Sequence, residues 1–176
     1  VYSKGFGYAD TLNKIEMQPW HRYRIASVSK LITATAIMKL VEQGEIQLDQ
    51  PAFGSKGVLS DPVFDRAIDE RIYTITVRDL LQHKAGWSKH KGDPVFMPLS
   101  IARKMNVNPP ADLNTIIRYM WQQKLDFTPG DKSSYSNFGY VLLGRIIEQV
   151  TSMPYEDYVN MHIFLPLGLY DIEIGG

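Results

Sequence analysis

The stretch that decides the fold is Arg24-Ile25-Ala26-Ser27-Val28-Ser29-Lys30, together with the apolar run that follows it through Val41. Apolar residues in that run go most of the way round a helix, which predicts a buried central helix over residues 27–43. Ser27 and Lys30 are three positions apart, so both side chains would lie on one side of a helical turn. A hydroxyl beside an ammonium that burial could deprotonate is a candidate nucleophile with a candidate base.

The pattern S-x-x-K is short, and this chain contains it twice. The second copy, Ser88 to Lys91, lies in a polar stretch between Gly86 and Gly92 that has no helical period and predicts a loop. Sequence context therefore selects Ser27. The plainer alternatives are that Ser27 is only a helix N-cap and Lys30 only a solvated lysine.

Composition limits the classes of partner. The chain has 176 residues, 44% of them hydrophobic and 22% charged, and its formal net charge is zero. These values fit one soluble domain and give no sign of a nucleic-acid or anionic-membrane partner. The absence of cysteine excludes disulfides and thiolate metal sites. No apolar stretch is long enough to span a bilayer, and we identify no signal peptide.

The remaining patterns predict a mixed chain dominated by helices. Strands are expected over residues 1–10 and 21–26, with a turn around Asn13, a short helix near 62–69, a Thr76-capped helix to His83, and helices over 112–124, 136–150 and 154–164. Residues 87–111 carry turn signals and little period, which indicates a long loop. Loops of this length are usually functional or mobile, so we expect this one to edge a site.

A second chemical motif is Tyr135-x-Asn137, just before the predicted helix over 136–150. In extended or turn backbone, side chains two positions apart point the same way. A tyrosine of lowered pKa beside a lysine ammonium can exchange a proton in acyl transfer, and an asparagine can hold a carbonyl or orient the lysine. The other Y-x-N, Tyr158 to Asn160, lies inside a helical pattern, where such side chains diverge.

Ser27-x-x-Lys30 followed by Tyr135-x-Asn137 resembles the first two motifs of the serine β-lactamase and penicillin-binding-protein superfamily, in its class C branch. Further segments match in order: Gly44-x-Ile46-x-Leu48-Asp49-x-Pro51, Ile75-Thr76-Val77-Arg78-Asp79-Leu80-Leu81-x-His83-x-Ala85-Gly86, Gly139-Tyr140-x-x-Leu143-Gly144 and Pro166-Leu167-Gly168-Leu169. The resemblance implies an α+β fold of the β-lactamase/DD-peptidase type. It also implies a structural rather than catalytic role for His83.

The chain departs from this family in its third motif, K-[ST]-G or H-x-G. No lysine follows Lys132, and the only later histidine is His162, in a different context. We therefore expect one partial domain over 1–176, with opening strands of an antiparallel sheet in 1–26, the catalytic helix and helical lobe in 27–176, and the C-terminal strands absent. The abrupt ends suggest a piece of a larger protein.

The resemblance implies a serine hydrolase that forms an acyl-enzyme on Ser27, with Lys30, Tyr135 and Asn137 as the other site residues. Candidate substrates are β-lactams, D-Ala-D-Ala peptides and small esters, with no cofactor and no metal. The alternative is a non-catalytic binding module of the same fold, favoured by the missing third motif. Family resemblance places the protein in the periplasm or outside the cell. Apolar faces left by missing strands predict a homo-oligomer or a complementing chain.

Overall fold

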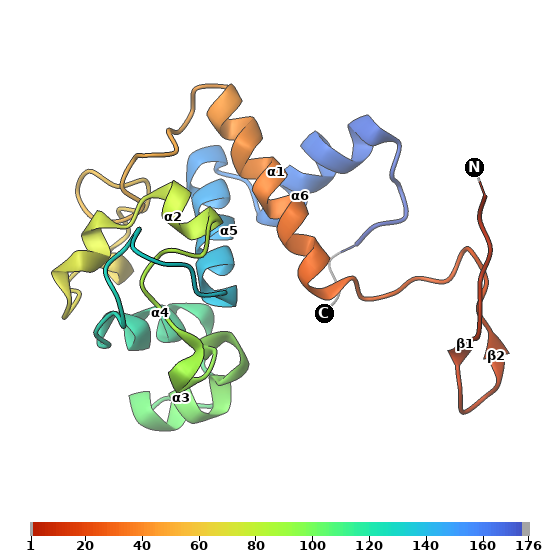
Figure 1. The fold of residues 1–176 in the computed structure, drawn as a ribbon, viewed down its shortest axis with the longest axis horizontal. Helices are drawn as coiled ribbons and strands as arrows, with labels where there is room; N and C mark the ends of the chain where they lie inside the picture. Colours follow the sequence, from red (N-terminus) through yellow and green to blue (C-terminus); the bar gives the residue numbers. More distant parts are fainter. Residues whose placement is uncertain (1, 174–176) are drawn as a thin grey trace.

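The computed structural model describes residues 2–173 and consists of a helical body and a small N-terminal hairpin (Figure 1). Strands β1 (Tyr8–Asp10) and β2 (Ile15–Glu16) pair antiparallel, with Tyr8 opposite Glu16. The Asp10 carboxylate accepts hydrogen bonds from the backbone N–H groups of Leu12 and Asn13 and so closes the turn. The hairpin stands apart from the helices in Figure 1. The predicted α+β class, with a helical lobe and the first strands of an antiparallel sheet, is confirmed.

The predicted strand over 21–26 is wrong. The partner of the first strand is β2, and residues 21–25 adopt no strand, while Ala26–Val28 form a 3-10 turn, η1. A strand persists only where a neighbour satisfies its backbone groups, and the described residues offer none beside 21–26. The first strand is also shorter than predicted, and Val1 lies outside the described residues.

The central helix α1 runs from Ser29 to Glu42, close to the predicted bounds, but it is buried on one face only. Thr33, Ala36, Ile37 and Leu40 face the helical body, where α1 packs on α5 (Asn137–Thr151) and α6 (Tyr155–Val159); the opposite apolar residues Val28, Leu31 and Met38 are exposed. The expectation of burial on most faces is therefore wrong for the described residues. No element among the described residues covers the exposed apolar face of α1 that carries Leu31 and Met38.

The other elements follow the predicted order with two differences. They are η2 (Pro62–Phe64), η3 (Glu70–Thr74), α2 (Val77–Leu81), η4 (Lys89–Lys91), η5 (Pro94–Phe96), α3 (Pro98–Met105), α4 (Leu113–Trp121), the π-helical η6 (Asn160–Phe164) and η7 (Leu165–Leu167). The capping prediction for Thr76 is confirmed, since its side chain and that of Asp79 form a capping box. The helix expected near 62–69 is only a 3-10 turn, and the predicted loop 87–111 contains a true helix, α3.

The core of the helical body is centred on aromatic rings. Phe53 packs against Phe64 and Trp121 with ring centroids 5.5 and 5.0 Å apart, and the Trp121 indole N–H donates to the Phe64 carbonyl at 2.8 Å. Trp87 meets Phe138, in the first turn of α5, edge to face at 5.0 Å. This packing fixes where α5 begins. No helix among residues 2–173 is long and apolar enough to cross a membrane.

Candidate functional site

Ser27 and Lys30 lie one turn apart at the start of α1. Ser27 belongs to the 3-10 turn that leads into the helix, and the Lys30 ammonium donates to Ser27 Oγ at 3.3 Å. The N-cap position of α1 is Val28, and no side chain makes a capping hydrogen bond there. The Ser27 side chain therefore does not cap α1, and the alternative that it serves only as an N-cap is wrong.

Tyr135 and Asn137 approach this pair from the start of α5. The Tyr135 hydroxyl donates to Ser27 Oγ at 2.6 Å, and Asn137 Oδ1 accepts from the Lys30 ammonium at 2.6 Å. Between them, the Ser136 hydroxyl caps α5 by accepting from the Gly139 N–H at 3.0 Å. This cap defines the first turn of α5 and orients its two neighbours. All four residues singled out in the sequence meet in one place.

Asp93 is a site residue that the sequence reasoning missed. Its Oδ2 accepts from Asn137 Nδ2 at 2.8 Å and from the Asn137 backbone N–H at 3.3 Å, while Oδ1 accepts from the Val95 N–H at the start of η5. A carboxylate only accepts, so it holds the amide nitrogen of Asn137 and turns the amide oxygen toward Lys30. The pair Asp93-Pro94 signals a turn start, but nothing local links it to Asn137.

His83 supports the Tyr135 segment, in agreement with its predicted structural role. Its Nδ1 accepts from the Ser136 N–H at 3.2 Å, and its carbonyl accepts from the Ser134 N–H at 2.8 Å. The imidazole ring lies 4.6 Å from the Tyr135 ring, centroid to centroid. Burial, and then the charges of Lys30 and Lys89, lower the pKa of His83. The neutral imidazole is therefore the form that fits here, as an acceptor for the backbone.

The electrostatic environment favours the ionised form of Tyr135. Hydrogen bonding to the Lys30 ammonium lowers the pKa of Tyr135 most, followed by the bond with Ser27 and the charges of Lys30 and Lys89. The ammonium of Lys30 lies 4.7 Å from the ring centroid, and that of Lys89 lies 4.3 Å away. Tyr135 is 36% exposed, so the residue is not enclosed by the helical body.

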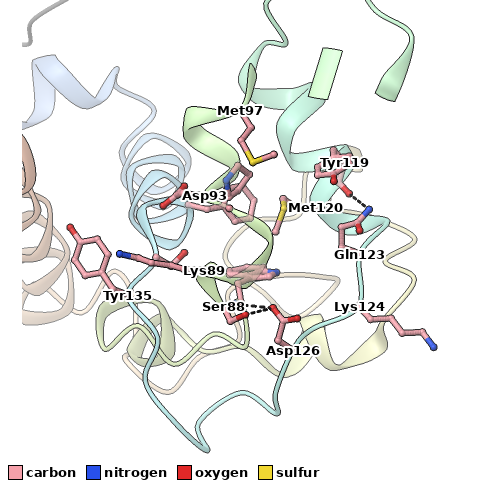
Figure 2. Close-up of a pocket in the computed structure, with 15 residues that line it drawn as sticks. Ser88, Lys89, Asp93, Met97, Tyr119, Met120, Gln123, Lys124, Asp126 and Tyr135 are labelled. Atoms are coloured by element: carbon pink, nitrogen blue, oxygen red, sulfur yellow. Dashed lines mark hydrogen bonds between the residues drawn. The ribbon is translucent and has the colours of Figure 1, made fainter. Parts of the chain in front are cut away.

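A small pocket of about 50 Å³ adjoins Tyr135 (Figure 2). Its apolar wall comes from Trp87, Met97, Tyr119, Met120 and Phe138, and its polar lining includes Lys89, Asp93 and Tyr135. Segment 87–97 supplies one side and α4 another. The 87–111 segment, which was expected to edge the site, lies beside the candidate site, since Lys89 contacts Tyr135 and Asp93 contacts Asn137.

The second S-x-x-K copy and the other Y-x-N contribute to packing and local structure. The hydroxyl and backbone N–H of Ser88 both donate to Asp126 Oδ2 at 2.9 Å, which ties the segment after Gly86 to the segment that follows α4 (Figure 2). Tyr158 is 3% exposed, and its hydroxyl has no hydrogen-bond partner among the described residues. Residues 2–173 also contain no cluster of three or more His, Cys, Asp or Glu side chains able to hold a metal ion.

Known proteins are similar to this chain in both sequence and fold. Protein flp of Staphylococcus aureus (strain MW2) is 34% identical over 166 residues, which cover 94% of this chain and 30% of flp. The penicillin-binding protein homologue of Pyrococcus abyssi, described as octameric, superposes with a TM-score of 0.69 at 32% identity, covering 97% of this chain and 36% of that one. The D-amino acid amidase of Ochrobactrum anthropi SV3 superposes with a TM-score of 0.69 at 32% identity, covering 94% of this chain and 41% of the amidase chain.

The chain thus spans between three-tenths and about two-fifths of the length of these relatives. The family model described as Beta-lactamase matches residues 1–176, the whole of the chain. The ordered motifs, the helical body and the convergence of Ser27 with Lys30 and Tyr135 agree with that match. The chain belongs to the Beta-lactamase family.

Proposed function

We propose that the protein is a serine hydrolase that acts through an acyl-enzyme on Ser27. The observation that carries the proposal is that Ser27 Oγ lies 2.6 Å from the Tyr135 hydroxyl and 3.3 Å from the Lys30 ammonium. A nucleophile needs a base within hydrogen-bond reach, and the base needs an orienting partner. Tyr135 and Lys30 fill these places, and Asn137 fixes Lys30.

In this mechanism Tyr135 accepts the Ser27 proton as a phenolate, and the Lys30 ammonium stabilises the phenolate charge. Ser27 Oγ attacks the substrate carbonyl carbon, and the proton on Tyr135 passes to the leaving group as the acyl bond to Ser27 forms. Tyr135 then removes a proton from water, which attacks the acyl carbon. The bond between Ser27 Oγ and the acyl carbon breaks, and Tyr135 returns the proton to Ser27 Oγ. The Ser27 N–H is one candidate oxyanion donor, and a strand carrying the family's third motif would supply the other.

Asn137 acts on Lys30 rather than on the substrate in this proposal. Its amide oxygen receives the Lys30 ammonium, and its amide nitrogen donates to Asp93. Of the two roles open to an asparagine here, the contacts favour orientation of the lysine. Lys30 is thereby held within reach of both Ser27 and Tyr135.

The substrate class that we propose is an amide or ester carbonyl: a β-lactam, a D-Ala-D-Ala peptide or a small ester. Two relatives support this range, since one is described as a penicillin-binding protein homologue and the other as a D-amino acid amidase. The chemistry needs no cofactor. Likeness to penicillin-binding proteins also supports a location in the periplasm or outside the cell, which fractionation of the source cells would test.

The test is covalent labelling of the full-length protein with a fluorescent penicillin and with a fluorophosphonate, read by intact mass and peptide mapping. We expect an adduct on Ser27 and none in Ser27→Ala. Ser27 is exposed and caps no helix, so this change should alter the free energy of unfolding by no more than about 0.5 kcal/mol. Ser88→Ala, the matched change in the other S-x-x-K copy, should keep the label.

The same experiment separates the alternative, a binding module without turnover. Saturable binding of the penicillin without any mass adduct would support that module and refute the hydrolase. An adduct that persists in Ser27→Ala would show that another residue is the nucleophile.

A further inference from the structure

A second lysine, outside the four residues of the proposed mechanism, lies against Tyr135. Lys89 comes from η4, and its ammonium is 4.3 Å from the Tyr135 ring centroid, closer than the 4.7 Å of Lys30. Figure 2 shows the Lys89 side chain extending toward Tyr135. In the part of the chain that the structure describes, Lys89 forms no ion pair, so its contact with the Tyr135 ring is the interaction that locates its charge.

We propose that Lys89 is a positioning residue that holds the Tyr135 side chain toward Ser27 and stabilises its phenolate form. The inference rests on the proposed role of Tyr135 as the base. While Tyr135 is neutral, the ammonium is attracted to the face of its ring. When Tyr135 ionises, the same charge is attracted to the phenolate, so Lys89 favours the form that can accept the Ser27 proton.

Lys30 and Lys89 differ in the residues that they contact. The Lys30 ammonium donates to Ser27 Oγ and to Asn137 Oδ1, and it also lies over the rings of Tyr135 and Tyr140. Lys89 reaches the ring from the 87–111 segment and touches neither Ser27 nor Asn137 through a hydrogen bond among the described residues. Its effect on the reaction therefore passes through Tyr135.

The titratable groups that face Tyr135 come from α1, η4, α5 and the residues just after α2. Lys30 from α1 and Lys89 from η4 carry positive charge. His83, just after α2, has its pKa lowered by burial, and its neutral form accepts a hydrogen bond from the backbone N–H of Ser136. In α5, burial and the charge of Tyr135 raise the pKa of Tyr140. Asp93 binds Asn137 rather than Tyr135. Both charged groups at Tyr135 are therefore cations, and both act in the same direction.

The experiment compares Lys89→Met with Lys89→Arg in the full-length protein, using a neutral ester over a range of pH. Lys104→Met is the matched control, because Lys104 also lies over a tyrosine ring, 5.2 Å from the centroid of Tyr119, away from Ser27. We expect Lys89→Met to move the acid limb of kcat/KM to higher pH and to lower kcat/KM below that limb roughly fivefold, the scale of one charge at such a distance in water. Lys89→Arg should restore the profile, and Lys104→Met should not change it.

A readout without turnover separates this inference from the proposed function. The ultraviolet absorbance of phenolate, titrated in each protein and compared with Tyr135→Phe, isolates the ionisation of Tyr135. Lys89→Met should move that titration to higher pH. An unmoved titration and acid limb would overturn the inference while leaving Ser27 chemistry standing. A rise in KM limited to anionic esters, with the acid limb unmoved, would also overturn it and make Lys89 a substrate-binding residue. Full activity in Tyr135→Phe would refute the proposed mechanism itself.

Discussion

Two regions of this molecule differ in how they are held, and the candidate site draws on both. The leading segment, residues 2–28, contains no buried residue, whereas residues 29–169, which form the helical lobe, contain every buried residue that the structure describes. Ser27 comes from the first, and Lys30, Tyr135 and Asn137 come from the second. The lobe therefore positions the base and its partners by packing, while Ser27 is positioned mainly by where α1 begins and by its hydrogen bonds.

The largest expected effect tests that contrast in stability directly. Phe53 is 1% exposed in the lobe core, and Phe6 is 73% exposed in the leading segment. Phe53→Ala should lower the free energy of unfolding by about 3–5 kcal/mol, because it removes buried ring contacts and leaves a cavity. Phe6→Ala should change it by no more than about 0.5 kcal/mol. Denaturant unfolding followed by circular dichroism measures both, and similar losses would show that the leading segment is packed in solution.

The next prediction concerns the 176 residues expressed alone. The relatives are much longer than the region they share with this chain, and α1 exposes Val28, Leu31 and Met38. A two-stranded sheet is at best marginal by itself, and exposed apolar faces and strand edges favour association. If no strand supplies the second oxyanion donor, turnover should be about a hundred- to a thousandfold below that of a protein that contains such a strand.

Sedimentation of the 176-residue chain and an ester-hydrolysis assay measure these two properties. We expect self-association, or pairing with a separate chain that supplies the remaining strands. A well-behaved monomer with full activity would contradict the prediction. It would mean that residues within this chain replace the third motif. It would also mean that the leading segment is stable without packing against further strands.

How far the sequence could predict this molecule depended on whether the determining contacts are local. The capping of α2 by Thr76 and of α5 by Ser136 is written within a few residues, and these helices were placed well. A strand over 21–26 would need a partner strand far away in the chain. Local alternation of apolar and polar residues does not show whether such a partner is present. Helix α3 has only eight residues, too few for its period to stand out among glycine and proline signals.

The same distinction holds in the candidate site. Ser27, Lys30, Tyr135 and Asn137 were found because each pair has a fixed short spacing, and the ordered motifs linked the two pairs. Asp93 lies 44 positions from the Asn137 amide that it holds, and Lys89 contacts Tyr135 across a similar separation. No period or spacing expresses such contacts, so these two residues became visible only in the fold.

Within the lobe, two tyrosines allow the site and the core to be compared by the same substitution. Tyr135→Phe should lower kcat/KM about a hundredfold or more, the usual scale for loss of a positioned acid–base group. Tyr158→Phe should leave activity near wild type and leave stability unchanged or slightly higher, because it removes a buried hydroxyl that has no hydrogen-bond partner among residues 2–173. Steady-state kinetics with a chromogenic ester measures both variants, and equal losses of activity would overturn the choice between the two Y-x-N motifs.

The smallest expected effect concerns the pH dependence of the lobe at His83. Burial, with the charges of Lys30 and Lys89, lowers the pKa of His83 from 6.5 in the folded protein. The unfolded chain therefore binds this proton at higher pH than the folded chain does, so stability is complete above about pH 6.5 and falls as pH drops from there toward the lower folded pKa. Because the imidazole is only half-buried, the slope of stability against pH should stay well below the roughly 1.4 kcal/mol per pH unit of one fully linked proton.

His83→Asn removes the titrating group, and asparagine tolerates the positive φ of 59° at this position. In unfolding free energies measured over this pH range, the wild-type curve should run parallel to that of His83→Asn above about pH 6.5 and fall relative to it as pH drops below that value. Curves that stay parallel throughout would show that the protonated imidazole is accommodated beside Ser136.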